Sequence, residues 1–366
     1  MKRLLGTLLI FLSLYSSAQK NKSHTLQLSS LENEDKPVIP FAGVKIIDAR
    51  FDKSTIGVVL DKYTFRGVSI NKKDALFPDS LTEYLPEIIS NIVDWMPEKE
   101  DSLVLLVKRF RIADHLNNVD VSGPRPELVC NVSISFFAGR KDGLHKLFTI
   151  EDVLARRISD DNIKYVSELS KLRDKVLFKL FCSFFENKNW VASSMAYPSA
   201  SVAEGIHKRF SLPVLVDSVK RPGIYRSFAE FKDNQPGIVN VKPVTSRGKV
   251  VAYKDTDGKY VTIKDYWGCC DGSKCYIVFR NSLYELEPKD KGFRFLSYRD
   301  NHDMQNDKSF GDYATDFGML PGGFAKVFND RRASEFFDLN MDSGEVYLEE
   351  LFGRSSLSSL QKEILR

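Results

Sequence analysis

Hydrophobic and polar positions between residues 43 and 190 follow the patterns of strands and helices in turn. Short apolar runs at 44–51 and 55–60 predict two strands, and the segments 103–112 and 127–137 predict two longer ones. The turn residues Asp142-Gly143 predict a hairpin into a further strand. These runs predict a sheet of about five strands.

Two longer segments have apolar residues three and four positions apart, which is the spacing of one helix face. The first starts at Asp79 or Ser80, either of which can cap a helix, and reaches Trp95. The second extends from Tyr165 to Asn187. Two amphipathic helices over such a sheet predict an α+β domain at residues 41–210.

The segment 127–137 alternates cleanly between apolar and polar residues. Asn131, Ser133 and Ser135 fall on one face of the predicted strand, and apolar side chains fall on the other. A polar sheet face is expected to meet water or a partner. These three residues are therefore the binding candidates of the first domain.

The pattern after residue 210 changes to short strands. Asp257-Gly258 predicts a hairpin, and further strands are predicted at 275–279, 283–286 and 293–298. Residues 211–302 thus predict a smaller, mostly-β meander domain. Residues 303–366 follow as a Gly-rich segment, a hairpin and a C-terminal helix. The predicted class is α+β, with a helix-on-sheet domain followed by this meander.

The start of the chain has the pattern of a secretory signal peptide. Lys2 and Arg3 precede a short apolar run, and Ser16 and Ala18 supply the small residues that a signal peptidase needs. We expect residues 1–18 to be removed and the protein to be exported, as a periplasmic or secreted protein. The polar segment 19–40 predicts a flexible lead-in. No later segment has the length and apolarity of a membrane span.

Charge gives little indication of a partner. The 366 residues carry 53 Lys and Arg against 49 Asp and Glu, a formal net charge of +4. This balance does not indicate nucleic acid as a partner. The run Lys108-Arg-Phe-Arg111 mixes cations with an aromatic residue, as single-strand binders do, but a solvated edge strand explains it more simply.

Five cysteines stand at positions 130, 182, 269, 270 and 275. The first two lie on apolar faces and predict core residues. Cys269, Cys270 and Cys275 flank an Asp-Gly-Ser-Lys turn, which a disulfide from Cys269 or Cys270 to Cys275 could close. A soft-metal site and redox chemistry are the alternatives.

A calcium loop is a weak candidate near the end of the chain. Asp338, Asn340, Asp342 and Glu349 match positions 1, 3, 5 and 12 of an EF-hand loop. The glycine required at position 6 is displaced, because Ser343 stands there. The alternation around the Asp-Ser-Gly turn favours a hairpin instead. No metal or other cofactor is expected.

No local catalytic motif is present, neither a nucleophile elbow nor a zinc-binding helix nor a phosphate-binding glycine loop. An enzyme would need a site that assembles only in the fold. Such a site could pair two carboxylates, or a carboxylate with His115, His207 or His302.

Residues 43–190 resemble the α+β domains of bacterial envelope lipoproteins and periplasmic accessory proteins. The resemblance rests on Val44-Lys-Ile-Ile-Asp-Ala-Arg-Phe51, Ile56-Gly57, the first helix, the strand from Val104 and the last helix. The chain lacks the lipidated cysteine of the lipoproteins. The second part, with Gly223-Ile-Tyr225 and Trp267-Gly268, resembles uncharacterised exported proteins.

The resemblance implies an assembly or binding module. Together with the absence of a catalytic motif, it favours a non-catalytic module of the cell envelope that binds an envelope protein or a glycan. The alternative is a secreted hydrolase with a carboxylate-based site.

Overall fold

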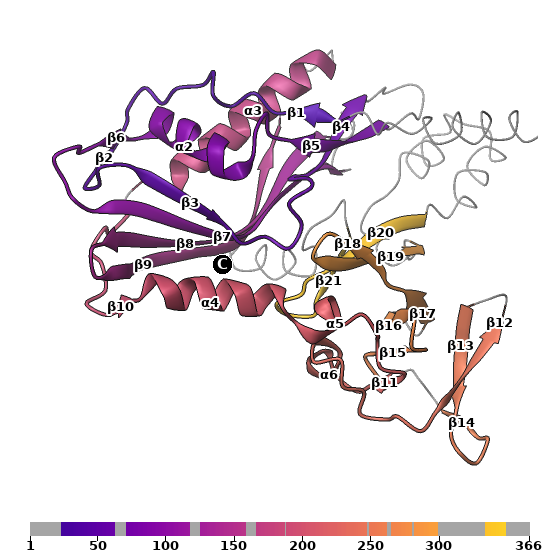
Figure 1. The fold of residues 1–366 in the computed structure, drawn as a ribbon. Helices are drawn as coiled ribbons and strands as arrows, with labels where there is room; N and C mark the ends of the chain where they lie inside the picture. The colour runs from indigo at the N-terminus through magenta and orange to yellow at the C-terminus, as the bar shows by residue number, and fades with distance from the viewer. Residues whose placement is uncertain are drawn as a thin grey trace, which may run out of the picture.

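The computed structural model describes residues 23–62, 71–117, 125–158, 166–186, 188–246, 249–261, 265–279, 282–298 and 334–348. These residues form a mixed α+β structure, in which a large sheet with few helices precedes smaller antiparallel sheets (Figure 1). The α+β class predicted from the sequence is confirmed. Residues 1–22, most of 303–366, Glu349 and His302 lie outside the described residues.

The large sheet has the strand order β1-β5-β4-β7-β8-β9-β10, with β3 beside the first half of β7. Strands β7, β8 and β9 form an antiparallel meander, whereas β3 and β4 run parallel to β7. The bounds are β1 His24–Thr25, β3 Val44–Asp48, β4 Gly57–Lys62, β5 Asn71–Leu76, β7 Ser102–Asn117, β8 Arg125–Arg140, β9 Gly143–Arg157 and β10 Ala196–Tyr197.

Helices α2 (Leu81–Ile92) and α3 (Val166–Ser183) cover one face of this sheet, which we call the inner face. Figure 1 shows both helices on the same side of the sheet, with α4 (Ser199–Phe210) on the other. The inner face and its helices bury one continuous apolar core, which includes Cys130 and Cys182 as predicted. Both predicted long helices are thus confirmed, within a few residues at their ends.

Two β-bulges determine which residues face away from this core. In β7 the register with β8 shifts between Val107 and Arg109, so that Val107 and Phe110 both pack on the inner face. In β9 the register shifts around Leu147, which packs toward the inner core together with Phe148. Because a bulge adds one residue, the alternation of sides changes phase at each of these points.

Helix α4 was not predicted. Val202, Ile206 and Phe210 stand four residues apart along it and pack on the outer face of the sheet, against a small cluster that includes Leu106 and Phe137. This spacing is the helical signal in the sequence. The helix has no fully buried residue, so its apolar stripe is weak.

The later part of the chain consists of short strands around a second, aromatic-rich core. It contains a sheet β11-β15-β16-β17, a sheet β12-β13-β14 and a sheet β18-β19-β20-β21. The hairpins predicted around Asp257-Gly258 and before Val346 are both present. The bounds are α5 Pro213–Val216, β11 Gly223–Tyr225, α6 Phe228–Lys232, β12 Lys242–Ser246, β13 Lys249–Lys254, β14 Tyr260–Val261, β15 Gly268–Cys270, β16 Cys275–Phe279, β17 Ser282–Glu285, β18 Glu287–Lys289, β19 Gly292–Tyr298, β20 Ser334–Leu339 and β21 Val346–Leu348.

Two expectations from the sequence are wrong. The described part of the lead-in, residues 23–40, is not a free segment: β1 pairs with β5, β2 (Val38–Ile39) pairs with β6 (Asp94–Trp95), and Leu26 and Leu28 are fully buried. Leu26, Leu28 and Ile39 fix this segment, because all three are buried in the core, whereas Val38 is exposed.

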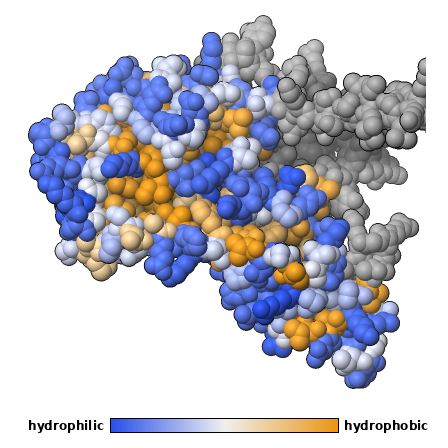
Figure 2. Space-filling model, in the orientation of Figure 1, coloured by the Kyte–Doolittle hydropathy of each residue, from blue (hydrophilic) through white to orange (hydrophobic). Residues whose placement is uncertain are grey.

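The second error concerns the basic run at residues 108–111. β7 is not an edge strand, because β8 pairs with it on one side and β3 and β4 pair with residues 103–107 and 112–113 on the other. Between these two pairings, Arg111 contacts Asp338 of β20. The open edge beside β7 belongs instead to β3, where Val44, Ile46 and Ile47 are half-buried. Figure 2 shows hydrophobic side chains gathered over the strands between α2 and α4 in this view.

Candidate functional site

The face of the large sheet opposite α2 and α3, here called the outer face, carries the polar residues predicted on β8. Asn131, Ser133 and Ser135 stand opposite Arg111, Arg109 and Leu106 of β7, respectively. Their exposed fractions are only 1%, 7% and 7%, so this face is not open to bulk water. The reason is that α4 and the turn between β20 and β21 both lie against it.

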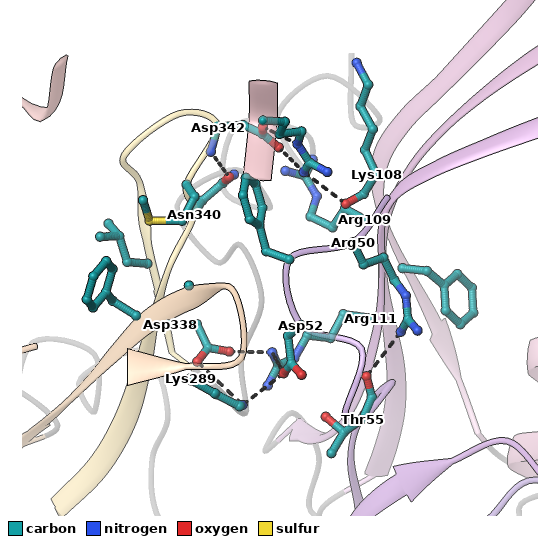
Figure 3. A pocket seen from close by; sticks show the side chains of 17 residues that line it. Arg50, Asp52, Thr55, Lys108, Arg109, Arg111, Lys289, Asp338, Asn340 and Asp342 are labelled. Atoms are coloured by element: carbon teal, nitrogen blue, oxygen red, sulfur yellow. Dashed lines mark hydrogen bonds and ion pairs between the residues drawn. The ribbon is translucent and has the colours of Figure 1, made fainter. Parts of the chain in front are cut away.

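Four charged side chains meet where the outer face contacts the last sheet, and we call them the ion-pair cluster. Nη1 of Arg111 lies 2.5 Å from Oδ2 of Asp338 and 3.4 Å from Oδ2 of Asp52. Nζ of Lys289 lies 3.2 Å from Asp52 and 3.8 Å from Asp338. Figure 3 shows the two carboxylates and the two cations converging from both sides of a cavity of about 100 Å³.

The ion-pair cluster controls the charge of Asp52. Burial raises the pKa of the Asp52 carboxyl, but the charge of Lys289, hydrogen bonds from Ser54 and the charge of Arg111 together lower it below its ordinary value. Asp52 is therefore ionised at neutral pH. A general acid for hydrolysis needs the opposite shift, so the two close carboxylates fit an ion-pair joint better than an acid–base pair.

Arg209 of α4 makes a second joint between the helix, the sheet and the β20–β21 turn. Its Nε and Nη2 donate to the two oxygens of Asp342 over 2.7 and 2.6 Å. The same guanidinium donates to the carbonyl oxygens of Ala49 and Lys108 and lies 4.0 Å from the Phe51 ring centroid. A planar guanidinium with five donors suits such a multiple contact.

Two cavities open on the outer face between these joints. One, of about 340 Å³, lies beneath α4 beside Val202, Gly205 and Ile206. The other, of about 500 Å³, lies between the sheet and the β20–β21 turn, which lines it from Asn340 to Glu345.

Lys108, Ser135 and Lys146 line both cavities. We call the two cavities together the lysine groove. Their volumes are within the range of small-ligand sites. Ser133 also lines the groove, whereas Asn131 does not line either cavity.

Three of the calcium candidates, Asp338, Asn340 and Asp342, lie on the β20–β21 hairpin, but their side chains are engaged otherwise. Asp338 pairs with Arg111, and Asp342 pairs with Arg209. The side-chain oxygen of Asn340 accepts a hydrogen bond from the Asp342 backbone N–H at 2.9 Å. Within the described ranges, no three His, Cys, Asp or Glu side chains gather as they would around a metal ion.

The three clustered cysteines are buried and divide between two faces of their hairpin. Cys270 and Cys275 stand directly opposite each other in β15 and β16, with their sulfur atoms 3.2 Å apart, and all three thiols are free. Cys269 belongs to a separate cluster with Tyr253 and Tyr276. Burial chiefly raises the pKa of the Cys269 thiol to about 12. A thiol held protonated in this way is a poor nucleophile.

Neither His145 nor His207 lines either cavity of the groove. His207 lies on the exposed side of α4, and His115 lies in β7. His145 is buried at the start of β9, where its ring nitrogens contact the Ser193 carbonyl oxygen at 2.9 Å and Asp142 at 3.0 Å. His145 therefore joins β9 to the segment that leads into β10.

The sequence did not indicate three cations of the groove as site residues. Lys146 and Arg209 were not singled out, and Lys108 was assigned to a solvated edge strand. The signal for Lys108 was present, since the run 108–111 breaks the alternation of β7. Arg209 lies about two turns after Val202, where the apolar stripe of α4 begins, and that helix was not predicted. Lys146 reaches the outer face only because of the bulge in β9.

In the part of the chain that the structure describes, no helix has both the length and the apolarity needed to cross a membrane. A comparison with protein families finds no family that matches this chain. A comparison with curated proteins finds no matching relative.

A comparison with solved structures finds partial matches. One is a Xanthomonas campestris protein of the DUF330 family that is 11% identical in sequence. The match covers 44% of this chain and 91% of that protein's chain, with a TM-score of 0.27. Another is an uncharacterised protein that is 12% identical in sequence. The match covers 45% of this chain and 100% of that protein's chain, with a TM-score of 0.22. The resemblance thus extends over somewhat less than half of this chain and indicates no function.

Proposed function

We propose that this chain is an exported, non-catalytic binding module of the bacterial cell envelope, with its ligand site in the lysine groove. The observation that carries this proposal is the chemistry of the groove. It offers hydroxyl groups of Ser133, Ser135 and Thr149 and the ammonium groups of Lys108 and Lys146. Such groups hydrogen-bond a polar ligand, such as a glycan or a polar protein segment.

The carboxylates near the groove support binding over hydrolysis. Asp52, Asp338 and Asp342 each contact an arginine at ion-pair distance. These pairs fix the later sheet against the outer face and so build the walls of the groove. Export rests on the signal-like start of the sequence, and cell fractionation with N-terminal sequencing tests it directly.

Gly205 offers a way to block the groove without disturbing the fold. It lines the cavity beneath α4, and a Cβ added there would meet no other atom within 4 Å. Replacement of a helical glycine also removes a backbone entropy cost of roughly 0.5–1 kcal/mol relative to alanine. Gly205→Phe should therefore fill the cavity and leave α4 intact.

The test compares Gly205→Phe with Ala203→Phe, which places the same ring on the same helix at an exposed position that does not line the groove. Each full-length protein is immobilised and exposed to envelope extract, and bound protein and carbohydrate are analysed. We expect wild type and Ala203→Phe to retain a component that Gly205→Phe does not retain. Retention by all three, or by none, would contradict the proposal.

A further inference from the structure

Lys108 and Lys146 differ from the other cations of the outer face. Arg109 lies 3.4 Å from Glu151, and Arg111 and Arg209 lie beside Asp338 and Asp342. Lys108 and Lys146 are exposed and have no ion pair or side-chain hydrogen bond with any described residue. Figure 3 shows the Lys108 side chain pointing away from the ion-pair cluster.

Each lysine is directed to the groove by a bulge. The extra residue in β7 lies between Val107 and Arg109, so both Lys108 and Arg109 reach the outer face. In β9 the bulge at Leu147 makes Lys146 the partner of Phe137 in β8. Phe137 packs on the outer face, so Lys146 lies on that face as well. Without this shift Lys146 would face the inner core. Bulges often re-aim side chains at functional sites.

Strand β8, which lies between the strands that carry Lys108 and Lys146, contributes a hydroxyl group to the groove. Ser135 of β8 lines the groove with both lysines, and its Oγ lies 3.1 Å from Oγ1 of Thr149. One of these hydroxyls donates to the other, and the pair keeps one further hydrogen available for an acceptor. The site thus combines two cations with a hydroxyl donor.

The acids of the groove do not neutralise the two lysines. Glu151 contacts Arg109, and Asp342 is bound by two nitrogens of Arg209. Glu345 stands on the opposite wall, on the β20–β21 hairpin, where its carboxylate accepts a hydrogen bond from the Ser343 hydroxyl at 3.1 Å. The two lysines are the cations of the groove that remain to be neutralised by a ligand.

We infer that the groove binds a phosphate group, held by Lys108, Lys146 and the Ser135 hydroxyl. A phosphate monoester presents three strong acceptor oxygens and nearly two negative charges, so it can satisfy donors that converge from three strands. Lysine recognises phosphate as a point charge and does not require a planar partner. This inference rests on the proposed function, because it names the ligand class of the same groove.

Calorimetric titration of the full chain with inorganic phosphate at low ionic strength tests whether the groove binds phosphate. We expect saturable binding that weakens about tenfold in Lys108→Gln and in Lys146→Gln, since each removes one charge-assisted hydrogen bond. Lys259→Gln, on the exposed turn between β13 and β14, is the matched control and should bind as wild type does. No saturable binding, or equal affinity in all four proteins, would overturn the inference.

A second arm separates the sources of the phosphate group. Vesicles of phosphatidylglycerol and of phosphatidylcholine are sedimented with the protein. Binding to the first alone, reduced in Lys108→Gln, assigns the group to a lipid headgroup; phosphate binding without vesicle binding assigns it to a phosphorylated soluble molecule.

The outcomes distinguish a wrong phosphate assignment from a wrong proposed function. If phosphate does not bind but Gly205→Phe still loses the envelope component that Ala203→Phe retains, the phosphate assignment is wrong and the groove remains the binding site. If phosphate binds at the two lysines but no envelope component is captured, the phosphate assignment holds and the proposed envelope-binding function is wrong.

Discussion

At the scale of single residues, the most buried charges have structural roles and lie away from the groove. Asp114 and Arg173 form an ion pair at 2.5 Å whose side chains are at most 1% exposed. The pair also bonds the backbone of Leu60, because Leu60 N–H donates to Asp114 and Arg173 donates to the Leu60 carbonyl oxygen. It thereby connects β4, β7 and α3.

Removal of one partner from this pair should be costly, because it leaves the other charge buried and uncompensated. We expect Asp114→Ala to lower the free energy of unfolding by about 3–5 kcal/mol. Urea unfolding measures this change. The exposed pair Glu204–Lys208 provides the control, since Glu204→Ala should leave the free energy of unfolding nearly unchanged. Equal costs would show that burial of the Asp114–Arg173 pair does not matter.

Asp52 makes the ion-pair cluster sensitive to acid. Its folded pKa is lowered, so its ionised form stabilises the folded chain above the ordinary pKa of aspartate, about 3.9. This stabilisation is lost as the pH falls through the folded pKa. The difference in unfolding free energy between wild type and Asp52→Asn should therefore be constant near neutral pH and shrink below about pH 4. A difference that does not change with pH would contradict the lowered pKa.

At the scale of elements, the β15–β16 hairpin brings Cys270 and Cys275 together. Asp271 N–H donates to the Lys274 carbonyl oxygen at the turn, so the next pair, Cys270 and Cys275, occupies a non-hydrogen-bonded site. Side chains approach each other most closely at such sites. Cys269, one residue earlier, faces the other side of the sheet.

We therefore expect oxidised glutathione to join Cys270 to Cys275 and to leave Cys269 as a thiol. The two thiols lose two protons and two electrons, and glutathione disulfide is reduced to two glutathione molecules. Peptide mapping after alkylation of the unfolded protein identifies the bond. Cys269→Ser should form the same bond as wild type, whereas a Cys269–Cys275 bond in wild type would contradict the register.

The sequence predicts most of these elements and fails where one residue changes the phase of a pattern. Strand 127–137 and the helix after Ser80 were predicted correctly, because their hydrophobic period is unbroken. In β7 the bulge at Lys108 changes which side chains face the core, so the basic run suggested a solvated edge. The position of a bulge depends on how a strand pairs with strands that are distant in sequence. The alternation within one strand does not show which residues its partners lie opposite, so it does not reveal the bulge.

The candidate site was predicted only in part for the same reason. Ser133 and Ser135 were identified from alternation within one strand. Lys146 and Arg209 come from other elements and join them only through the topology of the sheet and the position of α4. Their chemistry is ordinary for surface residues, and nothing in their local sequence distinguishes them.

At the scale of the whole molecule, the later sheets form the second wall of the groove. The ion-pair cluster and the Arg209–Asp342 contact both join the large sheet to the hairpin of β20 and β21. Phe51, from the loop after β3, adds an apolar contact by packing against the second core. The cavity between the large sheet and the β20–β21 turn therefore exists only while these contacts hold the two parts together.

Arg209→Ala should loosen the hairpin wall without unfolding either core. The variant loses a bidentate charge-assisted contact, worth roughly 1.5–3 kcal/mol. We expect hydrogen exchange of residues 338–345 to accelerate about tenfold or more, and exchange in α2 to stay unchanged. Lys208→Ala, the neighbouring exposed position, should leave both regions as in wild type.

The central claim is that a ligand from the cell envelope occupies the lysine groove, and photo-crosslinking tests it most directly. Ser343, an exposed residue of the β20–β21 turn that lines the groove, and Ala203 are replaced in turn by benzoylphenylalanine, and each full-length protein is irradiated in the envelope fraction. The proposed function predicts a crosslinked adduct from position 343 and none from position 203. An adduct from position 203 alone, or from neither position, would contradict it.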